Sequence, residues 1–123
     1  TLMQPYYVDK VTNYTGTEVK KNVPKSYKRI MTSEEAAQLK EYMAAVVSEG
    51  TGSVLSGRSY TVAGKTGTAE FSTSSKASHA WFVGYAHRED KEDIAVAVIV
   101  EDSGSGSEYA VPIAKKIFDA YYQ

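Results

Sequence analysis

The residues best suited to chemistry form one short run, Gly64-Lys65-Thr66-Gly67-Thr68-Ala69-Glu70. A glycine followed by lysine and threonine can bind phosphate when a Gly-x-x-x-x-Gly-Lys-Thr loop joins a strand to a helix. Ser59 stands where that loop needs its first glycine, and the residues after Lys65 continue an extended pattern. The sequence therefore argues against a nucleotide site and places a lysine and two threonines on a strand.

Other titratable residues do not form a recognisable site. His79 and His87 lack the spacing of metal ligands and a plausible set of carboxylate partners, so we predict no metal site. We interpret Glu70, Glu101 and Asp102 as surface charges, because paired catalytic carboxylates need a cleft geometry that sequence does not show. The absence of cysteine excludes disulfides and thiolate catalysis. No cofactor is predicted.

The composition is that of an ordinary globular piece. Of the 123 residues, 42% are hydrophobic and 24% are charged, and 14 basic residues balance 15 acidic ones. This balance gives no reason to expect nucleic acid or an anionic membrane surface as a partner. The longest apolar run, residues 94–100, is far shorter than the roughly 20 residues of a transmembrane helix, so the piece itself is expected to be soluble. Because the chain begins at Thr1, we expect a processed or excised product.

The first part of the chain predicts a β-hairpin. Residues 6–12 and 17–20 are rich in Tyr, Val and Thr, which favour strands. Residues 13–16 supply turn chemistry between them, and Gly16 can adopt the positive φ that such a turn needs.

A central helix is predicted over residues 33–48. Thr32 and Glu35 form a capping box, and apolar residues then recur at helical spacing. We interpret Gly50-Thr51-Gly52 as a structural turn that ends the helix, and we expect residues 53–59 to be a loop.

Three strand-like runs follow, at residues 60–71, 80–87 and 94–100. Their connections are short enough for antiparallel neighbours, so we predict a three-stranded meander. The Ser-rich stretches at residues 72–78 and 103–107 are expected to be surface loops. Three aromatic residues of the second run are expected to pack in the sheet or line a cleft: Trp81, Phe82 and Tyr85.

A second helix is predicted over residues 107–122, with Pro112 tolerated near its first turn. Its apolar residues form one stripe that should pack on the sheet: Ala110, Ile113, Ala114, Ile117, Phe118 and Tyr121. The predicted fold class is therefore α+β. It combines an antiparallel three-strand meander and an N-terminal hairpin, packed by a central and a C-terminal helix.

The last strand-like run is unusual because both of its faces are apolar. Residues 94–100 read as an interior strand, although the chain offers it only one sequential neighbour. An open apolar edge invites pairing with another chain. We therefore expect a missing segment or a homodimer partner at this edge.

Lys65-Thr66-Gly67 on a strand resembles the third motif of the penicillin-recognising serine acyltransferases, whose motif set is Ser-x-x-Lys, Ser-x-Asn and Lys-Thr-Gly. The likeness covers nearly the whole chain and is greatest to class B penicillin-binding proteins. Five further segments carry it: Gln4-Pro5-Tyr6-Tyr7-Val8, Glu49-Gly50-Thr51-Gly52, His79-Ala80-Trp81-Phe82-Val83-Gly84-Tyr85-Ala86, Ile94-Ala95-Val96-Ala97-Val98-Ile99-Val100-Glu101 and Ala110-Val111-Pro112-Ile113-Ala114.

The resemblance implies roles for four residues. Lys65 supplies positive charge and a hydrogen bond in the active site, and the hydroxyls of Thr66 and Thr68 bind the carboxylate of a D-Ala-D-Ala stem peptide or a β-lactam. The backbone N–H of Thr68 forms half of the oxyanion hole that stabilises the tetrahedral intermediate. Gly67 leaves room for the ligand to lie along the strand.

The other two family motifs are absent from the chain. No serine lies three residues before a lysine, and none lies two residues before Asn13 or Asn22. We therefore predict that residues 1–123 are the C-terminal portion of one transpeptidase domain and are inactive without its N-terminal half. By resemblance, the parent protein is anchored in the bacterial cytoplasmic membrane and faces outward.

Two alternative functions stay open at this point. A serine β-lactamase or β-lactam-sensing domain shares Lys-Thr-Gly, although the hairpin and Gly50-Thr51-Gly52 favour a transpeptidase. The chain could instead be a non-catalytic module that binds another chain, or a second copy of itself, through its sheet edge.

Overall fold

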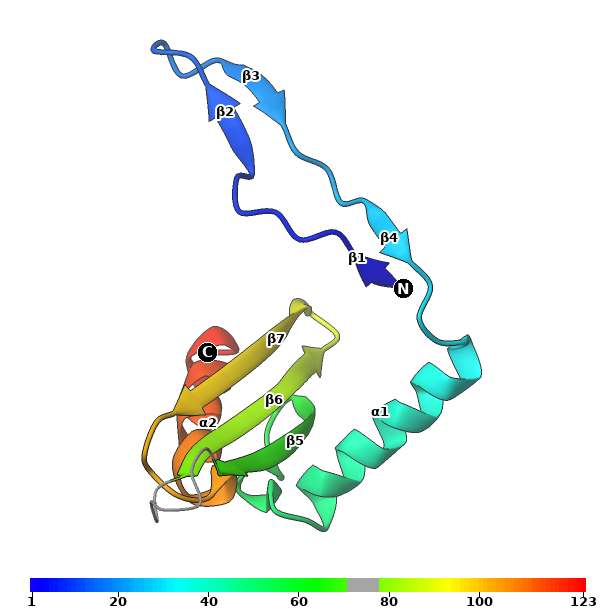
Figure 1. The fold of residues 1–123 in the computed structure, drawn as a ribbon, viewed down its shortest axis with the longest axis vertical. Helices are drawn as coiled ribbons and strands as arrows, with labels where there is room; N and C mark the ends of the chain where they lie inside the picture. The colour runs from blue at the N-terminus through cyan, green and yellow to red at the C-terminus, as the bar shows by residue number, and fades with distance from the viewer. Residues whose placement is uncertain (71–77) are drawn as a thin grey trace. The chain divides into compact units, whose positions relative to one another are not determined.

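The structure is a computed structural model that describes residues 1–70 and 78–123. Its contacts divide the chain into two compact units, Thr1–Ala36 and Ala37–Gln123 (Figure 1). The predicted α+β class is confirmed, because the described residues form antiparallel sheets and two α-helices.

The first unit is a two-stranded ribbon, in which one segment of the chain runs out and the next returns, and it contains two short antiparallel ladders. Strand β1 (Leu2–Met3) pairs with β4 (Ser26–Lys28), and β2 (Lys10–Thr12) pairs with β3 (Glu18–Lys21). The predicted hairpin is confirmed in the second ladder, but its first strand is shorter than residues 6–12. The first ladder was not predicted, because its strands are short and lie far apart in sequence.

The tip of the hairpin is held by one asparagine. Asn13 Oδ1 accepts hydrogen bonds from the backbone N–H of Thr15 at 3.0 Å and of Thr17 at 2.9 Å. Gly16 has φ +85°, the left-handed conformation that was predicted for this turn.

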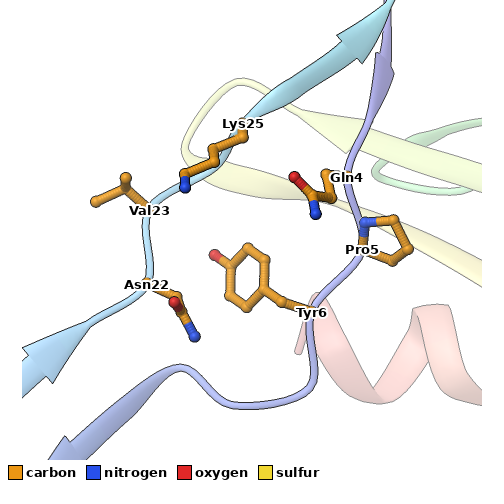
Figure 2. Close-up of a pocket in the computed structure, with 6 residues that line it drawn as sticks. All are labelled: Gln4, Pro5, Tyr6, Asn22, Val23 and Lys25. Carbon is orange, nitrogen blue, oxygen red and sulfur yellow. The ribbon is translucent and has the colours of Figure 1, made fainter.

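The two segments of the ribbon separate between the ladders and leave a small cavity of about 90 Å³ that is open to solvent (Figure 2). None of its lining residues was a predicted site residue: Gln4, Pro5, Tyr6, Asn22, Val23 and Lys25. The backbone N–H of Gln4 donates to the Lys25 carbonyl at 2.8 Å, so the cavity closes at the end nearer β1 and β4.

Helix α1 (Ser33–Ser48) begins at the predicted capping box. The Thr32 N–H donates to Glu35 Oε2 at 2.8 Å, and the Glu35 N–H donates to Thr32 Oγ1 at 3.2 Å. After the glycine turn, residues 53–59 are not wholly a loop as predicted. Ser53–Leu55 forms the 3₁₀ helix η1, and the side chain of Leu55 is 1% exposed. This leucine belongs to the core cluster and so anchors the segment on the core.

The second unit contains the predicted meander. Strands β5 (Thr61–Glu70), β6 (Ser78–Arg88) and β7 (Lys91–Val100) are antiparallel in the order β5-β6-β7. The end of the first predicted strand, Phe71, and most of the predicted loop at residues 72–78 lie outside the described residues. Ser78 itself belongs to β6 and is buried, with its hydroxyl donating to the Gly104 carbonyl at 3.1 Å.

Helix α2 (Val111–Tyr121) covers one face of this sheet (Figure 1). A π-helical turn, η2 (Gly106–Ala110), precedes it, so the predicted helix over residues 107–122 combines two helix types. The predicted apolar stripe is partly wrong. Ile113 and Ile117 are 40% and 38% exposed, whereas Val111 and Tyr122 are buried in their place.

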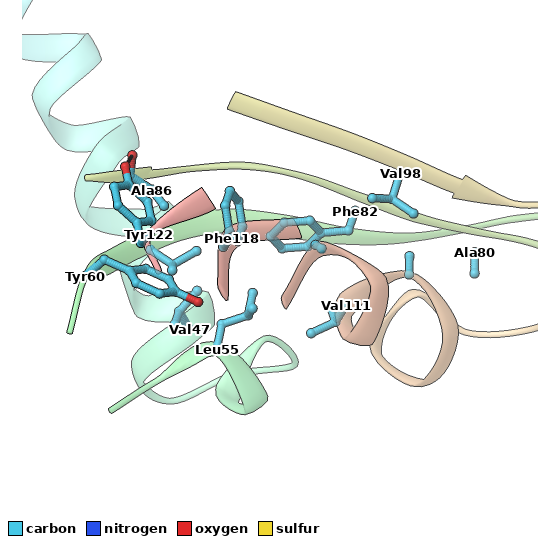
Figure 3. Packing of buried hydrophobic residues seen from close by; sticks show 13 residues of the cluster. Val47, Leu55, Tyr60, Ala80, Phe82, Ala86, Val98, Val111, Phe118 and Tyr122 are labelled. Atoms are coloured by element: carbon cyan, nitrogen blue, oxygen red, sulfur yellow. Dashed lines mark hydrogen bonds between the residues drawn. The ribbon is translucent and has the colours of Figure 1, made fainter. Parts of the chain in front are cut away.

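The core lies between the sheet and α2 (Figure 3). Phe82, Phe118 and Leu55 are among its largest fully buried side chains. The other buried members of the core cluster are Val47, Tyr60, Val62, Ala80, Ala86, Val98, Ala110, Val111, Ala114 and Tyr122.

A polar network closes the end of this core. Tyr60 donates its hydroxyl hydrogen to Asp119 Oδ1 at 2.6 Å, and Lys115 Nζ lies 2.7 Å from Asp119 Oδ2. Burial, followed by the contact with Asp119, raises the pKa of Tyr60 far above its ordinary value. Hydrogen bonds from Lys115 and then Tyr60 lower the pKa of Asp119.

Within the described residues of this unit, no helix packs across the opposite, uncovered face of the sheet, although Lys40 Nζ of α1 lies 5.8 Å from the centre of the Tyr85 ring. Trp81, Val83 and Ile99 are 37%, 43% and 45% exposed on it. Among the described residues β7 pairs with β6 alone, so its other edge is open as predicted.

Candidate active site

The predicted site residues lie on β5, which is an edge strand of the three-stranded sheet. Lys65 pairs with Val83, and Gly67 pairs with Trp81. Lys65 and Thr68 are exposed, and Thr66 and Gly67 are half-buried. Because β5 pairs with β6 alone in the part of the chain that the structure describes, alternate backbone N–H and C=O groups along its outer edge face away from β6.

The pleat of β5 divides the motif between two faces of the sheet. Lys65 and Gly67 share the uncovered face, whereas Thr66 and Thr68 point to the face that carries α2. All four residues border the free edge of the strand. A ligand that lies along this edge can therefore reach side chains from both faces.

The Lys65 ammonium folds along its own strand. Its Nζ donates to the Thr66 carbonyl oxygen at 2.6 Å, and the side chain stays exposed. An ammonium has three N–H donors, so this bond leaves capacity for a ligand. The arrangement provides a positive charge with unused donors beside the strand edge.

The hydroxyl of Thr66 has a partner that the sequence did not identify. Its Oγ1 lies 2.6 Å from Thr51 Oγ1, in the turn that follows α1. The sequence assigned Gly50-Thr51-Gly52 a structural role, and the glycines do have one. A Cβ on Gly50 would come within 2.9 Å of the Val46 carbonyl oxygen, and one on Gly52 within 3.2 Å. The turn therefore brings Thr51 to the motif strand.

The motif strand is supported from behind by η2. A Cβ on Gly106 would come within 2.6 Å of the Gly67 carbonyl oxygen and within 2.3 Å of the Trp81 carbonyl oxygen. Residues 103–105 form a loop as predicted, but Gly106 and Ser107 belong to η2, and the segment is half-buried to buried instead of lying at the surface. The physical reason is that this segment packs directly on the backbone of β5 and β6.

A second close contact, between Gly64 and the ring of Phe82, lies beside the start of the motif. Phe82 is fully buried, and a Cβ on Gly64 would come within 2.4 Å of its ring. Gly84 meets the same ring, because a Cβ there would lie 2.7 Å from it. Phe82 is therefore a core aromatic residue, as predicted. Its ring leaves no room for a side chain at position 64 or position 84. Trp81 and Tyr85 remain partly exposed.

The histidines differ in part from expectation. His87 does have a carboxylate partner, because its Nδ1 lies 2.6 Å from Asp93 Oδ1. His79 Nδ1 accepts a hydrogen bond from the Asp102 N–H at 3.2 Å. Within residues 1–70 and 78–123, no group of three or more His, Cys, Asp or Glu residues could hold a metal ion. In the same part of the chain, no helix is long and apolar enough to cross a membrane.

Comparisons with known proteins agree on one family. The family model described as "Penicillin binding protein transpeptidase domain" matches residues 1–119. Penicillin-binding protein 3 of Bacillus subtilis is 39% identical over 103 residues, which is 76% of this chain and 15% of that protein. Peptidoglycan D,D-transpeptidase MrdA of Haemophilus influenzae is 37% identical over 101 residues, covering 71% of this chain and 15% of that protein.

Solved structures share the fold as well. The ceftriaxone acyl-enzyme complex of penicillin-binding protein A from M. tuberculosis superposes with a TM-score of 0.82 at 28% identity, over 98% of this chain and 28% of that chain. The D,D-transpeptidase domain of a peptidoglycan glycosyltransferase from Eggerthella lenta gives a TM-score of 0.77 at 32% identity, over 97% of this chain and 28% of that chain.

The chain is much shorter than these proteins. It spans about 15% of the curated relatives and 28% of the two solved chains. The match nevertheless includes the Lys-Thr-Gly strand, both helices up to residue 119 and the ribbon. The resemblance inferred from sequence is therefore confirmed, and the chain belongs to the penicillin-binding protein transpeptidase domain family.

Proposed function

We propose that this chain is the C-terminal part of a D,D-transpeptidase domain that cross-links peptidoglycan through a serine acyl-enzyme and is acylated by β-lactams. The observation that carries the proposal is Lys65-Thr66-Gly67-Thr68 on a free edge strand, with an exposed ammonium and two hydroxyls beside that edge. Relatives named as D,D-transpeptidases and an acyl-enzyme complex among the solved neighbours support it.

In this proposal the nucleophile lies outside the chain. A serine hydroxyl attacks the carbonyl of the penultimate D-Ala, the peptide C–N bond breaks, and the terminal D-Ala leaves as an amine that takes up the serine proton. The amino group of a second stem peptide then attacks the ester, forms the cross-link and returns the hydroxyl to serine. A β-lactam follows the first step and stays attached as the ester.

In this scheme the residues of the chain bind the negative charges of the substrate and of the tetrahedral intermediate. Lys65 and the hydroxyls of Thr66 and Thr68 hold the substrate carboxylate, and the Thr68 backbone N–H donates to the oxyanion. Gly67 has no side chain to obstruct a peptide lying along the edge. Removing a single oxyanion donor commonly lowers the rate by about 10²–10³.

The partner of this chain is the N-terminal half of the same domain. Three observations support this: the open edge of β7, the exposed Trp81, Val83 and Ile99 on the uncovered face, and the 28% share of the solved domains. Such an apolar face needs cover in a soluble protein. A homodimer through the β7 edge is the competing arrangement. In the complete protein we place the domain on the outer side of the cytoplasmic membrane, where peptidoglycan is built.

Labelling with a fluorescent penicillin tests the proposal. The chain alone should remain unlabelled, and it should become part of a labelled complex when the N-terminal half carrying Ser-x-x-Lys is added. In the complete domain, Lys65→Ala should abolish labelling, whereas Lys116→Ala, which removes an exposed lysine of α2, should not. Covalent labelling of the chain alone, or full labelling of Lys65→Ala, would overturn the proposal. A stable homodimer that excludes the N-terminal half would favour the non-catalytic alternative.

A further inference from the structure

We infer that Thr51 is a positioning residue: it directs the Thr66 hydroxyl toward the substrate carboxylate and so helps the site to prefer ligands with a free carboxylate. This inference rests on the proposed function and adds a residue outside the Lys-Thr-Gly strand. Its basis is the pair of hydroxyl oxygens 2.6 Å apart, contributed by residues 15 positions apart in the chain.

The pair has only two protons to distribute. Each threonine hydroxyl has one O–H donor and two acceptor lone pairs. If Thr66 donates to Thr51, its proton is used and its lone pairs face an approaching anion. If Thr51 donates to Thr66, the Thr66 proton is available to the carboxylate. A carboxylate at the strand edge therefore favours the arrangement in which Thr51 donates its hydrogen bond to Thr66 and Thr66 donates its own to the carboxylate.

This arrangement of donors also strengthens the hydrogen bond from the Thr66 hydroxyl to the carboxylate. A hydroxyl that accepts one hydrogen bond becomes a better donor in the next, and the effect is larger where water is excluded. Thr66 is half-buried, while the hydroxyl pair itself is exposed to solvent in this chain, so this strengthening depends on the bound ligand excluding water. Thr51 acts through Thr66 and does not itself touch the ligand in this scheme.

The position of Thr51 is fixed by its neighbours. The Gly52 N–H donates to the Val46 carbonyl at 2.9 Å, and the Leu55 N–H donates to the Gly52 carbonyl at 2.9 Å. Leu55 is buried in the core, and Gly50 lies against the last turn of α1. The turn is therefore anchored on both sides of Thr51, as a residue with a positioning role requires.

The test compares two ligands in the complete domain. Acylation rates are measured with benzylpenicillin and with its methyl ester, which lacks the free carboxylate. Thr51→Val removes the hydroxyl but keeps the branched shape, and it should lower the rate with benzylpenicillin about tenfold, the effect of one lost hydrogen bond to an ionic network. The rate with the ester should change less than twofold. Thr51→Ser should restore the preference for the free acid, and Ser53→Ala, an exposed residue of the same segment, should leave it unchanged.

A double variant separates positioning from direct contact. If Thr51 acts through Thr66, adding Thr51→Val to Thr66→Val should cause no further loss. Additive losses would show that Thr51 contacts the ligand itself and would overturn the inference, as would equal losses with acid and ester. If Thr51→Val behaves as wild type while Lys65→Ala is inactive, this inference fails alone. If the wild-type domain is not acylated, the proposed function fails.

Discussion

The α-carbon of Gly106 lies against the backbone of Gly67, so that a Cβ at position 106 would come within 2.6 Å of the Gly67 carbonyl oxygen. The start of the C-terminal helical segment thus forms the support behind the Lys-Thr-Gly strand. The position of the motif depends on this contact as well as on its pairing with β6.

Gly106→Ala should therefore disturb both stability and the site. The added methyl group cannot be accommodated without moving η2 or the β5 and β6 backbones, and overpacking of this kind typically costs about 1–3 kcal/mol. Chemical denaturation should show the loss, and β-lactam acylation of the complete domain should fall with it. Glu108→Ala, which trims an exposed side chain of the same turn, is the control. Wild-type stability of Gly106→Ala would contradict the packing described.

Gly64→Ala should be destabilising because of Phe82. The new methyl group would meet the buried ring, and we expect a loss of about 1–3 kcal/mol in the free energy of unfolding. The cost should be smaller in a Phe82→Leu background, where the shorter side chain leaves room. A double-mutant cycle measures this coupling, and a coupling energy near zero would show that the ring is not the obstacle.

Tyr60→Phe tests the polar network at the end of α2. The substitution keeps the ring that stacks on Tyr122 at 4.8 Å and removes only the hydrogen bond to Asp119. The melting temperature should fall by a few degrees, and the pKa of Asp119 should rise, because Tyr60 is the second cause of its depression after Lys115. NMR titration follows the carboxyl group. Tyr109→Phe, at a half-exposed tyrosine, should change neither quantity.

The same tyrosine predicts how stability depends on alkaline pH. The pKa of Tyr60 is raised in the folded state, chiefly by burial. The unfolded chain therefore loses this proton near pH 10 while the folded chain still holds it. The stabilisation is complete below pH 10 and declines as the pH rises above it. Denaturation curves at several pH values should show this decline, and it should be shallower in Tyr60→Phe. An unchanged slope would exclude Tyr60 as its source.

Much of the fold followed from local patterns in the sequence. The capping box at Thr32 and Glu35 defined the start of α1, because its two hydrogen bonds involve neighbours in the chain. Gly16 marked the hairpin turn for the same reason. Strand-like runs separated by short connections located all three strands of the meander, and each strand contributes buried residues to the core.

The features that the sequence missed depend on contacts between distant segments. Ile113 fits the apolar spacing of α2, yet it is exposed while Val111 is buried, because the face that packs on the sheet is centred on residues 111, 114, 118 and 122. The Thr51–Thr66 hydrogen bond joins two elements, and only the shared hydroxyl chemistry beside the motif could have suggested it. Gly106 lay in a Ser/Gly-rich stretch, whose composition alone favours a loop.

The open edge of β7 has a consequence for handling the isolated chain. Residues 94–100 contain no charge and no proline, and the charged side chains of the strand are confined to its first residues, Lys91, Glu92 and Asp93. Natural edge strands usually carry charges or proline along their length, which discourage misassembly into fibrils. Charges flank this run at both ends, because Glu101 and Asp102 follow it, but none lies within it. The isolated chain therefore has little to oppose the pairing of this edge with a second copy of itself, and it should aggregate more readily than a domain in which a neighbouring strand covers the edge.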